Sequence, residues 1–192
     1  MKMDIILAGV GGQGILSIAA VIGMAAVESG LYLKQAEVHG MSQRGGAVQS
    51  HLRISDNPIA SDLIPEGSCD LIISVEPMES LRYLPFLSED GWIVTSSKMF
   101  QNIEDYPNEE FLMGAIRKVK NHQIIDAYGI AKGLGSQKVS NIVVLGAAMK
   151  MLSLTVESLN GALLSLFGRK GEAVVQLNIA ALKAGSDAAT YD

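Results

Sequence analysis

The glycine-rich stretch near the start of the chain constrains the fold more than any other feature of the sequence. An apolar run, residues 3–8, leads into Gly9-Val10-Gly11-Gly12-Gln13-Gly14, and nearly uncharged residues follow over 15–27. This order predicts a strand, a tight turn and a helix, because Gly9, Gly11 and Gly14 match the G-x-G-x-x-G pattern in that context. Backbone N–H groups at the helix N-terminus would suit a phosphate or carboxylate. A purely structural turn would show the same pattern, so both interpretations stay open.

A second strand is predicted after the first helix. Gly30 is expected to end that helix as a left-handed cap, and residues 31–38 are expected to run beside the first strand, completing a βαβ unit. Glu37 lies near the end of this strand. In dinucleotide-binding folds an acidic residue about 20 positions beyond the glycines binds the ribose hydroxyls. The position of Glu37 therefore leaves NAD binding open.

The segment after Glu37 predicts a binding loop. His39, Gln43 and Arg44 stand among glycines that include Gly45 and Gly46. Such a composition does not form a regular element, and it exposes backbone beside a cation. The alternative is a flexible link in which Arg44 is merely solvated.

Residues 47–54 alternate between apolar and polar side chains. This period of two predicts a half-exposed strand, antiparallel and at a sheet edge. His51 falls on the polar side of the alternation. We therefore expect His51 to be a surface residue and not a catalytic one.

The remainder of the chain alternates strands with helices and then becomes helical. Glu76 follows a buried strand at residues 70–75, at the end where ligands of open α/β sheets bind, and is therefore a residue of interest. The predicted fold is α/β: a three-layer α/β/α arrangement with a mixed, mostly parallel sheet, a Rossmann-like start and a helical C-terminal third. One domain, 1–192, is expected. Further elements are predicted as a strand at 92–95, a helix from Asn108 to Lys120, a strand at 123–127, and helices at 140–152, 156–167 and 171–183.

Composition excludes several classes of protein. The chain of 192 residues is 48% hydrophobic and 18% charged, but its longest apolar runs, 15–27 and 142–149, are shorter than the roughly 20 residues that a membrane span needs. The net charge is −5, and no basic, aromatic-rich stripe suggests nucleic-acid binding. Because no basic or apolar signal region precedes the first strand, we expect a cytoplasmic protein without a membrane segment.

The few cysteines and histidines limit the disulfides and metal sites that this chain can form. Cys69 is the single cysteine, so this chain alone can form no intramolecular disulfide and hold no iron–sulfur cluster. Its position beside a buried strand predicts a core residue. The three histidines lack zinc-ligand spacing, so no metal site is expected. No nucleophile and base pair or acidic dyad is visible, and the catalytic residues stay unknown.

Several segments together resemble a known family. The stretch 9–15 and the run Glu37-Val38-His39-Gly40-Met41-Ser42-Gln43-Arg44-Gly45-Gly46 are similar to those of the gamma-type subunits of 2-oxoacid:ferredoxin oxidoreductases. The resemblance continues through 139–147 and Asn178, and so spans nearly the whole chain. Within the family, Arg44-Gly45-Gly46 is shared, whereas the lead-in from His39 favours the indolepyruvate branch over pyruvate or 2-oxoglutarate members.

The resemblance implies a division of labour. A large alpha subunit is expected to hold thiamine pyrophosphate, Mg²⁺ and [4Fe-4S] clusters, while this chain supplies an accessory domain that closes over the active region. The implied reaction converts indolepyruvate and coenzyme A to indoleacetyl-CoA and carbon dioxide, with reduction of ferredoxin. The isolated chain, which holds no cofactor alone, is expected to be inactive. The expected cofactor-binding residues are Gly9, Gly11, Gly12, Gln13, Gly14, Glu37, His39, Gln43, Arg44, Gly45 and Gly46.

Two other functions compete with this interpretation. A self-contained NAD- or FAD-dependent oxidoreductase would bind nucleotide and turn over without a partner. A non-catalytic anion-binding or interaction domain would lack a cofactor-bearing partner. The short chain, which has no separate substrate region, argues against the first of these alternatives.

Overall fold

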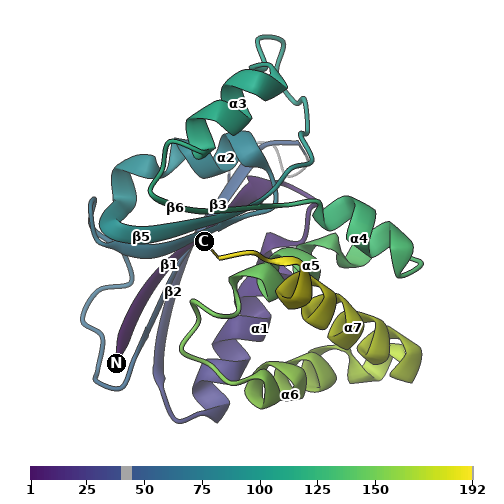
Figure 1. Ribbon diagram of the computed structural model, residues 1–192. Helices are drawn as coiled ribbons and strands as arrows, with labels where there is room; N and C mark the ends of the chain where they lie inside the picture. Colours follow the sequence, from purple (N-terminus) through teal and green to yellow (C-terminus); the bar gives the residue numbers. More distant parts are fainter. Residues whose placement is uncertain (40–44, 192) are drawn as a thin grey trace.

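The computed structural model describes residues 1–39 and 45–191, and for His39 the backbone alone (Figure 1). The strands are β1 (Lys2–Val10), β2 (Tyr32–His39), β3 (Ala47–Ser55), β4 (Cys69–Ser74), β5 (Leu87–Ser96) and β6 (Asn121–Ile125). The α-helices in these ranges are α1 (Ile15–Glu28), α2 (Pro77–Arg82), α3 (Glu109–Ile116), α4 (Ala127–Gly133), α5 (Ser140–Ala148), α6 (Val156–Phe167) and α7 (Glu172–Ala188).

The strands form one sheet in the order β2-β3-β1-β4-β5-β6. β1, β4, β5 and β6 are parallel neighbours, whereas β3 runs antiparallel to both β1 and β2. Helices α2 and α3 cover one face of the sheet, and α1, α5 and α7 lie on the other side (Figure 1). The predicted three-layer α/β/α fold with a mixed, mostly parallel sheet is confirmed.

The central strand β1 contributes to both cores, because successive side chains of a strand point to opposite faces. Ile5 and Leu7 belong to the larger cluster with α1 and α5, whereas Ile6 and Ala8 belong to the smaller cluster under α2 and α3. All four side chains are fully buried. A strand buried on both faces reads as a continuous apolar run, which explains the composition of residues 3–8.

The predicted place of the second strand is wrong. β2 does not pair with β1, because β3 lies between them and bonds to β1 from Lys2↔Ser55 to Val10↔Ala47. The short connection from β2 to β3 makes these two strands antiparallel neighbours. β2 takes the edge, where its exposed Lys34 and Glu37 suit a strand with one open side.

The edge position predicted for β3, and with it the exposure of His51, is also wrong. His51 is 4% exposed, its Nδ1 accepts a hydrogen bond from the Ile64 N–H at 3.0 Å, and its ring meets Phe86 edge-on. The segment after β3 folds back over the polar side of that strand. The alternation of apolar and polar residues in β3 therefore predicted the two faces of the strand correctly, but it did not reveal that other segments cover both faces.

Residues at the ends of helices predicted the structure better than the strand patterns did. Gly30 ends α1 in the left-handed region at φ +77°, as predicted. α6 has the predicted bounds, and Thr155 caps it through a bond from the Ser158 N–H at 3.1 Å. Helix α3 ends at Ile116 and α5 at Ala148, each four residues earlier than expected. Among the helices of the described ranges, none is both long and apolar enough to cross a bilayer.

Candidate functional site

The glycine turn lies at the carboxyl end of β1 and is held by its own side chains. The Gln13 N–H donates to the Val10 carbonyl at 3.1 Å, and the Val10 N–H donates to Gln13 Oε1 at 2.8 Å. Gly14 then starts α1 with φ +82°, a left-handed conformation that glycine adopts without a steric penalty. Gln13 therefore serves the turn, and its side-chain oxygen is already occupied.

The two glycine segments that were predicted separately lie side by side. The Gly11 N–H donates to the Gly46 carbonyl at 2.8 Å, and the Gly45 N–H donates to the Gly11 carbonyl at 3.4 Å. These bonds continue the β1–β3 ladder beyond the last strand residues. Gln43 and Arg44 lie outside the described residues, as does the side chain of His39.

Several backbone N–H groups of the glycine turn already donate hydrogen bonds within the protein. The N–H groups of Val10, Gly11 and Gln13 all have protein acceptors. The first turn of α1 differs, since among the described residues no side chain caps it. The N–H groups of Ile15 and Leu16 have no intrahelical partner in such a turn. They border a hollow of about 280 Å³ lined by Val10, Gly11, Gly12, Gly14, Ile15, Leu16 and Val48.

Glu37 lies apart from the glycine turn. It is opposite Ser50 on β3, and Ser50 is opposite Leu7 on β1, so β3 separates Glu37 from the strand that carries the turn. Its carboxylate accepts a bond from the Gln35 side chain on the same strand. In a dinucleotide-binding fold the acidic residue ends a strand adjacent to the glycine turn. The placement of Glu37 argues against that role.

Asn141 ties the start of α5 to the glycine turn. Its Nδ2 donates to the Gly14 carbonyl at 3.0 Å, and a Cβ on Gly14 would lie 2.6 Å from this nitrogen. Asn178 donates within its own helix, to the Val174 carbonyl at 2.8 Å. Each asparagine therefore makes a structural hydrogen bond.

A groove crosses the carboxyl ends of β1, β4 and β5. It has a volume of about 240 Å³, and it lies where the strand order changes direction, the usual ligand position in open α/β sheets. A wider hollow of about 670 Å³ shares Lys98, Met99, Phe100 and Tyr128 with it. The residues lining the groove are Gly12, Gln13, Val75, Ser96, Lys98, Met99, Phe100, Tyr128, Gln137, Lys138 and Ser140.

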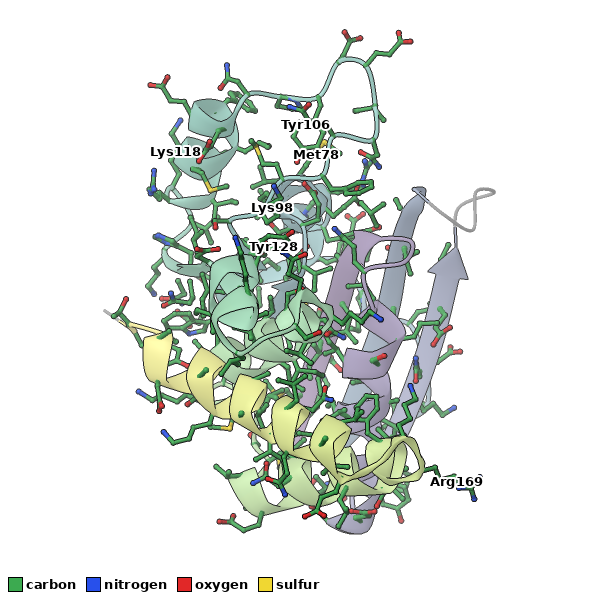
Figure 2. The ribbon with its side chains drawn as sticks, turned by 90° about the vertical axis from the view of Figure 1, so that its right-hand side faces the viewer. Met78, Lys98, Tyr106, Lys118, Tyr128 and Arg169 are labelled. Atoms are coloured by element: carbon green, nitrogen blue, oxygen red, sulfur yellow. The ribbon has the colours of Figure 1, made fainter. Side chains whose placement is uncertain are left out.

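Two lysines give this groove a basic character. Lys98 follows β5, and its Nζ lies 5.5 Å from the centre of the Tyr128 ring at the start of α4 (Figure 2). Lys138 precedes α5, whose first residue Ser140 is also in the wall. The groove can therefore accept an anionic group. The sequence did not predict this groove, because nothing local shows that these segments converge.

Glu76 is the buried carboxyl group at this end of the sheet. It is fully buried, and its side chain accepts bonds from the Glu79 N–H at 2.9 Å, the Phe100 N–H at 3.3 Å and the Tyr106 hydroxyl. Burial raises the pKa of Glu76, while the hydrogen bond from Tyr106 acts in the opposite direction. The sequence identified Glu76 by its position after β4 but did not predict these partners.

Cys69 is a core residue, as predicted. Its side chain is fully buried, and burial raises the pKa of the thiol to about 12. A thiolate ligand for a metal must be deprotonated, so this cysteine does not suit one. Within residues 1–39 and 45–191, no three His, Cys, Asp or Glu side chains are grouped as metal ligands would be.

Comparison with known proteins gives a consistent result. The family described as pyruvate ferredoxin/flavodoxin oxidoreductase matches residues 4–188. The indolepyruvate oxidoreductase subunit IorB of Archaeoglobus fulgidus is 36% identical over 96% of this chain and 94% of its own length. The gamma subunit of a keto/oxoacid ferredoxin oxidoreductase from Geobacter sulfurreducens is 28% identical, with a TM-score of 0.69 over 97% of this chain and 98% of the other.

A longer solved protein contains the same fold. The 2-oxoglutarate:ferredoxin oxidoreductase of Magnetococcus marinus, solved with 2-oxoglutarate, coenzyme A and succinyl-CoA bound, matches with a TM-score of 0.78 at 22% identity. The match covers 98% of this chain but 31% of that one, so the present chain spans about a third of the larger protein. The match over residues 4–188 and the likeness to the Archaeoglobus subunit along nearly its whole length show that the chain belongs to the pyruvate ferredoxin/flavodoxin oxidoreductase family.

Proposed function

We propose that this chain is the accessory subunit of a thiamine-dependent 2-oxoacid:ferredoxin oxidoreductase that acts on indolepyruvate. The complex would decarboxylate indolepyruvate oxidatively, transfer the acyl group to coenzyme A and pass the two electrons to ferredoxin. The observation that carries this proposal is the likeness to the Archaeoglobus subunit, 36% identical over 94% of that protein's length. The segment from Glu37 to Gly46 adds support, because its lead-in resembles the indolepyruvate branch.

The donor groups of this chain support a partner that holds the cofactors. An iron–sulfur cluster needs several thiolates, whereas the chain offers the single buried thiol of Cys69. The residues present therefore do not fit a cluster. We assign thiamine pyrophosphate, Mg²⁺ and the [4Fe-4S] clusters to the large alpha subunit, and ferredoxin would reach this chain only through the complex. The cytoplasm is the location that we propose.

We assign to the active region the side of the sheet at which the parallel strands have their carboxyl ends, here called the carboxyl edge. Coenzyme A carries phosphates, and the groove with Lys98 and Lys138 fits such groups by charge. The first turn of α1 offers N–H groups to an anion. Gly12, where a Cβ would meet no atom within 4 Å, would let a ligand or partner backbone approach closely, whereas Gly9 and Gly14 make room for side chains of this chain. Gly11 would contribute through its place in the turn.

The loop between β2 and β3 belongs to the same proposed site. The contact between Gly11 and Gly46 supports its closeness to the glycine turn. We propose that Arg44 binds a carboxylate or phosphate at the closed active site, with His39 and Gln43 as further polar contacts. Gln13 would act by shaping the turn. Glu37, which β3 separates from the turn, would support the site indirectly.

Reconstitution tests the proposal. The subunit is purified alone and together with the cofactor-bearing subunit encoded in the same organism, and indolepyruvate-dependent reduction of ferredoxin or methyl viologen is measured with and without coenzyme A. We expect activity from the pair and none from either subunit alone. Turnover by the isolated chain with NAD would contradict the proposal. Activity of the pair with 2-oxoglutarate or pyruvate but not indolepyruvate would reject the substrate assignment alone.

A further inference from the structure

Residues 97–107, here called the strap, cross the carboxyl end of the sheet between β5 and α3 without forming a helix or strand. Their polar sequence explains the irregular path, since few of these side chains are buried. Two labelled residues of the strap, Lys98 and Tyr106, mark its course in Figure 2. A segment with so few buried side chains opens at a low cost in free energy, so the loss of a single hydrogen bond that holds it should have a measurable effect.

The strap is fastened to Glu76 at two points, one on each side of Asn102. The carboxylate accepts the Phe100 N–H at 3.3 Å and the Tyr106 hydroxyl, from two points six residues apart in the strap. Glu76 itself is firmly placed, because it caps α2 through the Glu79 N–H and is followed by Pro77 in the first helical turn. A fully buried carboxyl group whose bonds reach outside its own helix does more than a helix cap requires.

Another fastening joins the strap to the glycine segments. Asn102 Nδ2 donates to the Gly45 carbonyl at 2.9 Å, and Gly45 in turn bonds to Gly11. The strap also supplies Lys98, Met99 and Phe100 to the groove wall. A continuous series of bonds therefore runs from Glu76 at the end of β4, through the strap, to the glycine turn at the end of β1.

We propose that Glu76 is a positioning residue for the reaction: it holds the strap so that Asn102 fixes Gly45 beside the glycine turn and Lys98 stays in the groove. The strap is thus the element through which Glu76 acts on ligand binding. The activity part of this inference rests on the proposed function. Its structural part, the coupling of Glu76 to Gly45, does not.

Variants of the strap separate this role from helix capping. Tyr106→Phe removes one hydroxyl bond to Glu76, and Asn102→Ala removes the bond to Gly45, while both leave the cap of α2 intact. Tyr191→Phe is the matched control, because it removes a comparable hydroxyl bond, to the Ala147 carbonyl at 2.8 Å, away from the strap and the groove. Glu76→Gln is a secondary variant, since its effect on the cap can lower stability.

Hydrogen exchange of the assembled complex is the first readout. For Tyr106→Phe we expect amide exchange to rise about tenfold in residues 97–107, the effect of losing one hydrogen bond, and also to rise at Gly45 and Gly46. Asn102→Ala should raise exchange at Gly45 and Gly46, and combining the two changes should give less than the product of their effects. Unchanged exchange at Gly45 and Gly46 in Tyr106→Phe would overturn the coupling.

Kinetics of the same complexes are the second readout. We expect Tyr106→Phe and Asn102→Ala to raise the KM for coenzyme A at least fivefold and to change kcat less than twofold, with Tyr191→Phe unchanged. Equal changes in all three variants would show a general loss of stability and reject the positioning role. If the wild-type complex lacks activity with indolepyruvate, the proposed function fails, but the exchange measurement still decides whether Glu76 and Gly45 are coupled.

Discussion

Substitution of Gly14 tests the contact between the glycine turn and α5. Gly14 has φ +82°, and an alanine there costs about 1–2 kcal/mol because the left-handed region is unfavourable for residues with a Cβ. The new Cβ would also lie 2.6 Å from Asn141 Nδ2, which forces that side chain to move and breaks its bond to the Gly14 carbonyl. The lost bond adds about 1 kcal/mol. We expect Gly14→Ala to lower the free energy of unfolding by about 2–3 kcal/mol.

A double-mutant cycle separates the two contributions. Asn141→Ala alone loses the same hydrogen bond, so the double variant Gly14→Ala/Asn141→Ala should be less destabilised than the sum of the single changes by about 1 kcal/mol. Gly12→Ala is the control, since its φ of +101° imposes strain but its Cβ would meet no atom within 4 Å. The assay is equilibrium urea unfolding followed by circular dichroism. Additive effects of Gly14→Ala and Asn141→Ala, or equal coupling of Asn141→Ala to Gly12→Ala, would refute the contact.

Three further predictions concern single residues. Arg44→Lys should lower turnover of the assembled complex about tenfold or more without changing the folding of the subunit, because lysine cannot make the bidentate contact of a guanidinium group. Full activity of this variant at saturating substrates would show that Arg44 does not belong to the site. Burial, and next Arg53, lower the pKa of His51 below its ordinary 6.5. Below pH 6.5 the unfolded chain therefore binds a proton at His51 that the folded chain does not. The free energy of unfolding, measured by urea titration, should fall as the pH decreases from 7 towards 5.5, and it should fall less steeply in His51→Gln. An equal pH dependence of the two proteins would argue against burial of neutral His51. Cys69, with its thiol pKa raised to about 12, should resist Ellman's reagent at pH 8 until urea unfolds the protein; fast reaction in the native state would contradict its burial.

Features encoded over a few neighbouring residues were predictable from the sequence. Gly30 marked the end of α1. Asn108 marked the start of α3, which it caps by accepting a bond from the Phe111 N–H at 2.8 Å. Each signal satisfies backbone groups within one helical turn, so no long-range contact is needed to interpret it.

Strand order was harder to predict, because it depends on which distant segments pair. The apolar pattern of β2 is compatible with a position beside β1 or beside β3. The antiparallel pairing of β2 with β3, which the sequence pattern does not reveal, determines which position it takes. His51 illustrates the same difficulty, since the segment that covers it is irregular and reaches it through the Ile64 N–H. A strand with polar residues on one side looks exposed until such a cover is known.

The candidate site divides in the same way. The glycine turn and the segment around Gly45 were recognisable as motifs, and their contact with each other follows from the β1–β3 register. The groove was not recognisable, because Lys98, Tyr128 and Lys138 come from the β5–α3 connection, from α4 and from the α4–α5 connection, which converge only after the strands are ordered. The strap carried no local signal, and its importance depends on Glu76, which is buried 30 residues away in the chain from Tyr106.

Hydrogen exchange of the subunit alone and in the assembled complex gives the most direct test of where the partner closes over this chain. We expect new protection at the carboxyl edge of the sheet, in residues 9–16 and 97–107. We expect little change at the opposite edge, around Asp56 and Trp92. Protection confined to that opposite edge, with the glycine turn and the strap unchanged, would contradict the proposed place of this subunit at the active region.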